Sequence, residues 1–379
     1  MIEPLHAHVE PLVVPVGESS SFRLVADAPS VTLPPGQYQI SVKNKRSGHH
    51  NALITVSMNQ EGMVAFDYAA PISGECYVDV SFPSGYTHRA GSFFLTEKEL
   101  AVRLPLRGDM HVHTWYSDGV SSPLDAVARA RDLGLDFVAI TDHNNWAGSV
   151  EGRNAAEQVG LPTIVLLGEE VSFERGHIVA VATSSGVAEA RSAPTYEQEL
   201  KSIMAELTSR SLESGLSPAD YAQAVWAARK VHSLGGLAFV AHPFWVHADE
   251  FHLDRRVARQ LLLDGEVDGI ELLGEVEFED NMLAIACYME LLQQGLTTTV
   301  VGNSDTHGLQ HTYGSYWSTV FAREHSQVGL LTALREGYSV ACVHLPGEQL
   351  RIYGPLPLVE YAYFLHRRFF PARQQRLWP

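Results

Sequence analysis

Cysteine is scarce in this chain of 379 residues, and its scarcity excludes two kinds of site. The three cysteines are Cys76, Cys287 and Cys342, an odd number at wide spacing, so they provide neither a disulfide framework nor a zinc-binding cysteine pattern. Such cysteine usage fits a reducing compartment. A G-x-S-x-G segment is also absent, which removes the usual sequence signature of a serine hydrolase.

Long apolar runs and an excess of positive charge are missing as well. No apolar run approaches the ~20 residues of a membrane span, and Met1–Glu10 lacks the basic start and apolar core of a signal peptide. We therefore expect a cytoplasmic protein, with a trimmed secretory leader as the open alternative. The formal net charge of −17 disfavours a nucleic-acid backbone as the main partner and leaves a small-molecule substrate.

Histidines and carboxylates, in contrast, gather where strand-like segments end. His111 and His113 follow the run that begins near Val102, and residues two apart on a strand point to the same face, so both can hold one ion. Asp118 adds a carboxylate from the next loop. The same arrangement recurs in four further places, where an apolar run precedes metal-ligating side chains: Phe137–Ile140 before Asp142 and His143, Ile164–Leu167 before Glu169 and Glu170, Leu237–Ala241 before His242, and Thr297–Val301 before Asp305 and His307. Buried strands of barrel-like α/β proteins show this pattern, and their ligands bind where the strands run into loops.

The spacing between Glu170 and His177 predicts local geometry. Only six residues separate them, and Ile178–Ala182 again resembles a strand. The gap is too short for a helical crossover, so we expect an antiparallel hairpin whose two strands place both side chains on one rim.

From Arg107 to His307 these residues resemble the PHP (polymerase and histidinol phosphatase) metallohydrolases. The resemblance implies a distorted (βα)7 PHP barrel with two to three divalent ions, and it assigns nine ligands. By resemblance the first ion takes His111, His113, Asp305 and a bridging Glu170, the second takes Glu170, His177 and His242, and the third takes Asp118, His143 and His307. The mixed ligands suit zinc, manganese or iron. Because Glu169 is the neighbour of Glu170 in the chain, it is the alternative candidate for this bridging ligand.

Later segments resemble the carbaryl-hydrolase branch of the family. The loop after Asp305 with Gly314, and Leu334–Gly337, carry this resemblance, and that branch often has an extra β domain in front. Short alternating segments over residues 1–103 predict such a domain, an antiparallel β-sandwich. We expect the barrel over residues 104–345, a helical insertion at 185–235, and an aromatic and basic arm over 346–379. The β domain or the arm is our candidate for homo-oligomer contacts.

Residues beside the ligands are candidates for the remaining functions. Asp109 and Asp142 alternate away from ligand histidines, and we expect them to accept the second ring N–H of those histidines. Arg175, in the turn before His177, suits a clamp on a phosphate or carboxylate, or is a plain turn residue. The remaining candidates for contacts with substrate follow ligands in the chain: Asn144, Trp245 and His311, of which His311 is also a candidate general acid.

These expectations describe a metal-dependent hydrolase that uses a metal-bridged hydroxide. Asp305, His311 and Arg175 are the residues we assign to catalysis. A phosphoesterase acting on small phosphate mono- or diesters is the first interpretation, since phosphoesterases dominate the wider family. A carbamate, ester or amide hydrolase of the carbaryl-hydrolase type is the alternative. A non-catalytic, metal-stabilised binding protein is the second alternative, which the complete set of nine ligands disfavours.

Overall fold

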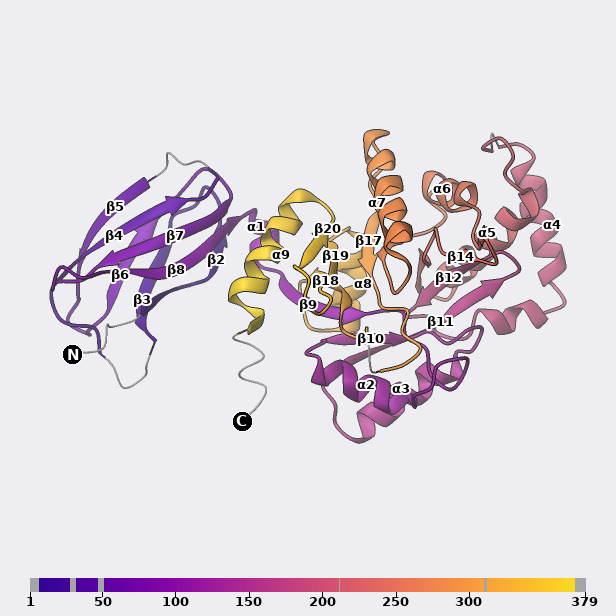
Figure 1. Cartoon of the computed structure of the whole chain (residues 1–379), viewed down its shortest axis with the longest axis horizontal. Helices are drawn as coiled ribbons and strands as arrows, with labels where there is room; N and C mark the ends of the chain where they lie inside the picture. The colour runs from indigo at the N-terminus through magenta and orange to yellow at the C-terminus, as the bar shows by residue number, and fades with distance from the viewer. Residues whose placement is uncertain (1–6, 28–31, 47–50, 211, 310–311, 372–379) are drawn as a thin grey trace. The chain divides into compact units, whose positions relative to one another are not determined.

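The computed structural model describes residues 7–27, 32–46, 51–210, 212–309 and 312–371. The chain divides into two compact units (Figure 1). The first combines the residues up to Arg103 with those from Glu360 onward, and the second comprises Leu104–Val359. The domain boundaries expected from the sequence, with a separate C-terminal arm, stay a prediction. Trp378 and the other residues after 371 lie outside the described part.

The first unit is built from two β-sheets. One has three antiparallel strands in the order β1-β3-β6, and the other has five in the order β2-β8-β7-β4-β5, in which only β2 and β8 are parallel. The strands are β1 (Ala7–Glu10), β2 (Val13–Pro15), β3 (Ser20–Ala26), β4 (Gln37–Asn44), β5 (Asn51–Ser57), β6 (Val64–Tyr68), β7 (Gly74–Ser81) and β8 (Thr87–Thr96). Alternate residues of both sheets, such as Phe22 and Phe66 in one and Ile40 and Phe93 in the other, share a single core. The expected all-β N-terminal region is confirmed.

A short and a long helix complete this unit. The short one is α1 (Lys98–Ala101), and the long one is α9 (Leu356–Arg368), near the C-terminus. The rings of Tyr361 and Phe364 on α9 lie 5.2 and 5.3 Å from the ring of Phe94 on β8. Arg367 also donates to Glu75 across 2.8 Å. The aromatic and basic residues of the described C-terminal segment therefore pack on the first unit's own sheet.

The second unit is a ten-stranded sheet that curls into a nearly closed barrel. The strand order is β17-β16-β13-β12-β11-β10-β9-β18-β19-β20. The strands are β9 (Leu104–Asp109), β10 (Phe137–Ile140), β11 (Ile164–Phe173), β12 (Gly176–Val181), β13 (Leu237–Val240), β16 (Gly269–Leu273), β17 (Thr299–Gly302), β18 (Tyr316–Ala322), β19 (Ser339–Val343) and β20 (Arg351–Tyr353). Side chains close the gap beside β17, where Ser318 Oγ donates to Gly302 O and Ser339 Oγ donates to Val300 O.

Helices cover the outside of this barrel (Figure 1). They are α2 (Pro123–Asp132), α3 (Ala147–Gln158), η1 (Ala188–Ser192), α4 (Tyr196–Leu207), α5 (Pro218–Ser233), α6 (Arg255–Leu263), α7 (Phe278–Gln293) and α8 (Gln327–Arg335). Ser122 and Ser217 cap α2 and α5, and a proline follows each cap at the first helical position, where its missing N–H costs no hydrogen bond. No helix among the described residues is long and apolar enough to cross a membrane.

The predicted helical insertion contains η1, α4 and α5. Buried residues of α5, including Tyr221, Val225 and Val231, belong to the same core as Ile178 of β12 and Val240 of β13. Helix α5 therefore covers the barrel wall. Helix α4 packs on α5 from outside, where the Tyr196 and Trp226 rings lie 4.7 Å apart.

The hairpin expected between Glu170 and His177 is confirmed. Strands β11 and β12 pair antiparallel from Gly168↔Val181 to Phe173↔Gly176, with Ser172 opposite His177. Glu170 lies two residues before Ser172 and so shares its face of the sheet. The hairpin thus brings the Glu170 and His177 side chains to the same rim of the barrel.

Candidate metal centre

The first two histidines follow a strand rather than lying on it. Strand β9 ends at Asp109, and the chain stays extended while Val112 forms an isolated bridge with Thr306. The His113 N–H donates to Thr306 O across 2.9 Å. This pairing of two strand exits, which lie far apart in sequence, places His111 and His113 beside the loop that carries Asp305.

Four side chains converge first: His111, His113, Glu170 and Asp305. His111 Nε2 lies 3.3 Å from Glu170 Oε2 and 3.2 Å from Asp305 Oδ1, and His113 Nε2 lies 3.0 Å from the same Asp305 oxygen. The His111 and Glu170 side chains are fully buried, whereas that of Asp305 is 17% exposed. The four residues that resemblance assigns to the first ion therefore lie together.

Two atoms of this group lack the hydrogen bonds that buried polar atoms normally make. Within the described part of the chain, His111 Nε2 and Glu170 Oε2 are both buried without a hydrogen-bond partner. A buried polar atom left without a partner costs about 1–3 kcal/mol. The ligand atoms of the four residues all lie within 4.8 Å of one another, and imidazole nitrogens with carboxylate oxygens are a donor set that divalent ions such as zinc accept. The residues therefore fit a bound metal ion.

A second group surrounds the other oxygen of Glu170. Oε1 lies 2.8 Å from His177 Nδ1 and 3.0 Å from His242 Nε2, and the two histidine nitrogens are 3.4 Å apart. His143 also approaches, with Nδ1 2.9 Å from Glu170 Oε2. Glu170 therefore connects the first and second groups.

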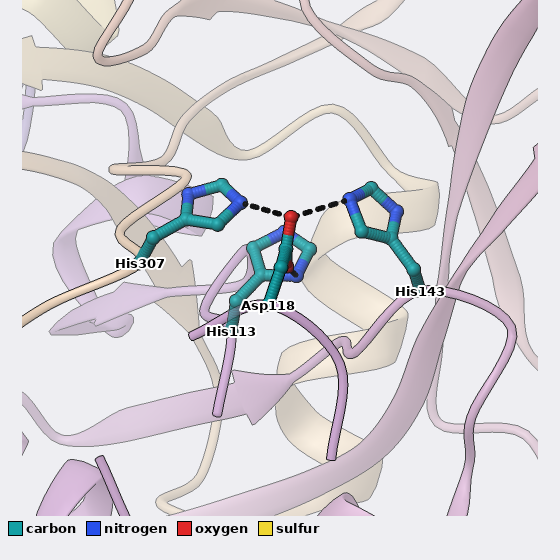
Figure 2. A group of neighbouring side chains, drawn as sticks. All are labelled: His113, Asp118, His143 and His307. Atoms are coloured by element: carbon teal, nitrogen blue, oxygen red, sulfur yellow. Dashed lines mark ion pairs between the residues drawn. The ribbon is translucent and has the colours of Figure 1, made fainter. Parts of the chain in front are cut away.

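The third group is the most open (Figure 2). His143 and His307 face the Asp118 carboxylate from opposite sides, with Nε2 atoms 3.5 and 3.3 Å from Asp118 Oδ2, and His113 lies close behind. His113 therefore belongs to this group as well as to the first. Gly119 allows the loop to fold back, because a Cβ there would lie only 2.4 Å from the backbone of His113. The Asp118 side chain is 54% exposed and that of His307 is 43% exposed.

Electrostatic interactions favour the charged forms of His111, Glu170 and Asp305 despite burial, whereas at His177 burial prevails and lowers the pKa. Burial opposes the charge on His111, but the carboxylates of Asp305, Glu170 and Glu271 outweigh it and hold the histidine pKa well above its ordinary value. Burial also opposes charge on Glu170, and the neighbouring His111 and His177 overcome it, so the Glu170 pKa lies well below the usual range. Asp305 shows the same balance, with its pKa lowered by histidines against the effect of burial. Carboxylates that stay ionised in a buried site are ready to bind a cation.

Two ligand candidates have left-handed backbone conformations. The φ angle is 22° at His242 and 53° at Asp305, a region that side chains other than glycine rarely adopt. His242 is the second residue after β13 and Asp305 the third after β17, and each side chain lies in the cluster. Such strain persists only where surrounding bonds impose it, and the His242 N–H is held by Glu271 Oε2 at 2.9 Å.

Glu271 is a functional candidate that the sequence reasoning missed. It lies on β16, is buried, and its Oε1 lies 3.0 Å from His111 Nδ1 and accepts a 2.7 Å bond from the Asn303 amide. One carboxylate therefore orients the His111 ring, the His242 backbone and Asn303. A glutamate inside the apolar run Gly269–Leu273 is the signal that identifies it from sequence.

Asp109 and Asp142 are buried next to the ligands, but their partners differ from those expected. Asp109 Oδ1 accepts backbone N–H bonds from His111 and Ser304, both of 3.1 Å, and burial raises its pKa to about 7. Asp142 accepts bonds from Thr114 N and Thr114 Oγ1, both of 2.7 Å. The partner of the His111 ring is Glu271, because Asp109 is turned toward the backbone of the two strand exits. Both aspartates therefore hold loops, not imidazole rings.

Glu169 and Glu170 point to opposite faces of β11. Glu169 Oε1 accepts the N–H groups of Val187 and Ala188, the latter at 3.3 Å. It therefore anchors the start of η1, while Glu170 alone of this pair enters the cluster.

The predicted substrate contacts fall in different places. Arg175 is 46% exposed and pairs with Glu250 at 2.9 Å. Asn144 Oδ1 accepts from Ser172 N at 3.0 Å and from Arg191 Nη1 at 3.2 Å. His311 lies outside the described residues.

Trp245 and a second missed residue line the side of the cluster near His177. The Trp245 ring lies 5.4 Å from the His242 ring and 5.2 Å from that of His252. His252 Nε2 approaches His177 Nε2 to 3.1 Å, and burial together with His177 and His242 lowers the His252 pKa to about 4. From sequence His252 resembled a surface or packing residue, because no strand-like run precedes it.

Comparison with known proteins supports the resemblance found in the residues. The family model described as "PHP domain" matches residues 109–253. Residues 109–253 are a PHP domain. Ligand candidates up to His242 lie inside this match, while Asp305 and His307 lie beyond it and complete the cluster through the bridge to Val112. The carbaryl-hydrolase branch stays a prediction.

Curated relatives of the PHP domain include polymerases and phosphatases. The chain is 36% identical over 139 residues to an error-prone DNA polymerase of Cutibacterium acnes, covering 36% of this chain and 11% of the polymerase. It is 32% identical over 109 residues to a 3',5'-nucleoside bisphosphate phosphatase of Chromobacterium violaceum, covering 29% of this chain and 37% of that enzyme. The chain thus matches well under two thirds of either relative.

One solved two-domain structure is similar to this chain at low sequence identity. It is a two-domain protein from Bacteroides vulgatus containing a predicted PHP-like metal-dependent phosphoesterase, 21% identical, with a TM-score of 0.47. The match covers 64% of this chain and 66% of that one.

Proposed function

We propose that this protein is a metal-dependent phosphoesterase that hydrolyses small phosphate mono- or diesters. The observation that carries the proposal is the pair of buried atoms, His111 Nε2 and Glu170 Oε2, that converge without hydrogen-bond partners among the described residues. The PHP domain match, and the phosphatase among its relatives, support phosphate chemistry.

The nine predicted ligands fall into groups suited to two to three ions. His111, His113, Glu170 and Asp305 would hold the first, and Glu170, His177 and His242 the second. Asp118, His143 and His307 would hold the third, with His113 shared. Zinc, manganese or iron suits this mixture of imidazole and carboxylate.

Bound divalent ions would lower the pKa of water and offset the charge that develops on a phosphoryl oxygen. The candidate ligands differ in how far their side chains are exposed to solvent. The His111 and Glu170 side chains are sealed from solvent, whereas those of Asp118 and His307 are open to it. Substrate therefore reaches the cluster from the side of the third group.

Arg191 is the cation that we assign to the substrate phosphate, in place of Arg175. It lies on η1, and its bond to Asn144 connects it through Ser172 to His143, whose Nδ1 lies 2.8 Å from Ser172 Oγ. Within the described part of the chain Arg191 makes no ion pair, although it is half-buried. Burial lowers the pKa of Arg191, so an anionic oxygen would stabilise its charge. Arg175, in contrast, already pairs with Glu250.

The decisive experiment measures metal content and substrate class together. Protein loaded in turn with zinc, manganese and iron is assayed against matched aryl phosphates, aryl carbamates and aryl esters. We expect about two to three ions per chain by elemental analysis and chelator-sensitive turnover of the phosphates. Preferred hydrolysis of carbamates would favour the carbaryl-hydrolase alternative, and metal binding without any turnover would favour the binding-protein alternative.

Two arginine variants test the assigned phosphate contact. Arg191→Ala should raise KM for a phosphate monoester by roughly 10–100-fold, because a hydrogen bond to a charged group contributes about 1.5–3 kcal/mol. Arg175→Ala removes the same charge from the exposed pair with Glu250 and is the matched control, with KM expected within about twofold of the parent. The reverse order would restore Arg175 as the phosphate clamp.

A further inference from the structure

A small hairpin beside the second group precedes His252, whose side chain contacts the Nε2 atom of His177. It consists of β14 (Val246–His247) and β15 (Glu250–Phe251), joined by a two-residue turn. Both turn residues, Ala248 and Asp249, have positive φ angles of 50° and 66°, as a tight hairpin turn of this type requires. The hairpin connects the exit of β13, which carries His242, to helix α6.

Several contacts hold the base of this hairpin against the cluster. The Trp245 N–H donates to His242 O and the His252 N–H donates to Trp245 O, both across 2.9 Å. Phe251 packs edge-on against Phe244 with ring centroids 5.7 Å apart. Gly176 allows the approach from the opposite side, because a Cβ there would lie 2.5 Å from the buried Leu253.

The two ring nitrogens of His177 therefore have different surroundings. Nδ1 faces the second group, 2.8 Å from Glu170 Oε1, whereas Nε2 lies 3.1 Å from His252 Nε2. A neutral imidazole carries its proton on one nitrogen and a lone pair on the other. If Nδ1 is to ligate an ion, the proton must reside on Nε2, and the group facing Nε2 must accept a hydrogen bond.

We infer that His252 is the positioning residue for His177: its Nε2 accepts the hydrogen bond of His177 Nε2–H and so presents the Nδ1 lone pair to the second metal site. The inference rests on the proposed metal-dependent function. The ring partners of two other ligand histidines are oxygens, since Glu271 lies against His111 Nδ1 and Ser172 Oγ against His143 Nδ1. At His177 the ring partner is the imidazole of His252. Partners of this kind typically contribute 10–100-fold to metal affinity.

The test compares metal binding by three variants, measured by calorimetric titration of metal-free protein with Zn²⁺. His252→Leu fills similar space but cannot accept a hydrogen bond, and we expect the weakest-binding step to lose roughly 10–100-fold in affinity. His252→Gln retains an acceptor oxygen and should recover most of that loss. His247→Leu is the matched control on the same hairpin, because His247 contacts Trp245 and His252 but no ligand, and it should titrate like the parent.

A second measurement needs no substitution. Nitrogen chemical shifts of His177 in the Zn²⁺-loaded parent protein distinguish a protonated Nε2 from a protonated Nδ1, and we expect the proton on Nε2. Parent-like titration of His252→Leu, or a proton on Nδ1 of His177, would overturn the inference while leaving the metal centre intact. A parent protein that binds no Zn²⁺ would overturn the inference together with the proposed function.

Discussion

Two regions of the second unit are rich in charge, and they are built in opposite ways. Around helices α4 and α5, Glu206 and Glu266 accept several bonds from Arg210 and Arg229, including the 2.7 Å bond from Arg229 Nη2 to Glu266 Oε1; we call these four residues the helical network. At the barrel rim, histidine nitrogens and carboxylate oxygens crowd together, and among the described residues the ion-pair partners of Asp118, Glu170 and Asp305 are histidines.

The difference shows which cluster is complete without a ligand. The helical network matches guanidinium donors to carboxylate acceptors, so every named charge has its counter-charge within the protein. In the rim cluster, the buried atoms His111 Nε2 and Glu170 Oε2 lie 3.3 Å apart, and neither has a hydrogen-bond partner of acceptable geometry among the described residues. Charge density alone therefore does not identify a site; unmatched buried acceptors do.

The largest expected effect comes from the residue that connects the first two groups. Glu170→Gln should remove ions from both and lower kcat/KM by roughly 10³-fold, since metal ions contribute several kcal/mol of transition-state stabilisation. Glu169→Gln is the matched control, because an amide oxygen can still accept the N–H bonds of Val187 and Ala188. Elemental analysis and steady-state kinetics on both variants measure the effect. Equal losses of metal and of kcat/KM in the two variants would contradict the assignment of Glu170, and not Glu169, as the bridging ligand.

Metal addition should stabilise the barrel cluster and leave the helical network unaffected. A ligand at 100 times its Kd stabilises the folded state by about 2.7 kcal/mol, or roughly 5–10 °C in Tm for a domain of this size. Calorimetry of metal-free protein, with and without Mn²⁺ or Zn²⁺, measures the shift. An unchanged Tm, with metal shown to be bound, would mean that the rim cluster needs no counter-charge.

A smaller effect is expected at Glu271, which contacts Nδ1 of His111 and orients its ring. Glu271→Gln removes the charge that faces His111 Nδ1 while keeping the side-chain shape, and we expect metal affinity to fall about 10–100-fold. Titration of metal-free protein with Mn²⁺ provides the measurement. Glu275→Gln, on the loop just after β16 and hydrogen-bonded to Thr312, is the control and should bind metal normally.

The smallest effect belongs to the helical network and depends on pH. The hydrogen bond from Arg229 lowers the pKa of Glu206 to about 2, below its ordinary value of 4.5. The ionised carboxylate therefore contributes stability that is present above pH 4.5 and is lost as pH falls toward 2. Because Glu206 is 41% exposed, Glu206→Gln should cost under about 1 kcal/mol near neutral pH. Urea unfolding at several pH values should show the parent and the variant converging in acid.

Much of the site was predictable because its ligands follow apolar strands. Strand exits share one rim, so His143, Glu170 and His242 could be brought together from local pattern alone. The short spacing to His177 also predicted its hairpin. Residues whose partners lie across the barrel were not predictable in this way. Asp109 and Glu271 show this: the His111 N–H donates to Asp109, and the His111 ring contacts Glu271.

The sequence by itself determined the types of ligand, their order along the chain and the β11–β12 hairpin, because these depend on side-chain periodicity and loop length. The bridging place of Glu170 was already expected from the family resemblance, and only the tertiary structure showed that His113 and His143 each belong to two groups. It also decided that Arg191, unlike Arg175, makes no ion pair among the described residues, and that His252 contacts His177. These contacts join segments far apart in the chain, and only the closure of the barrel brings such segments within hydrogen-bonding distance.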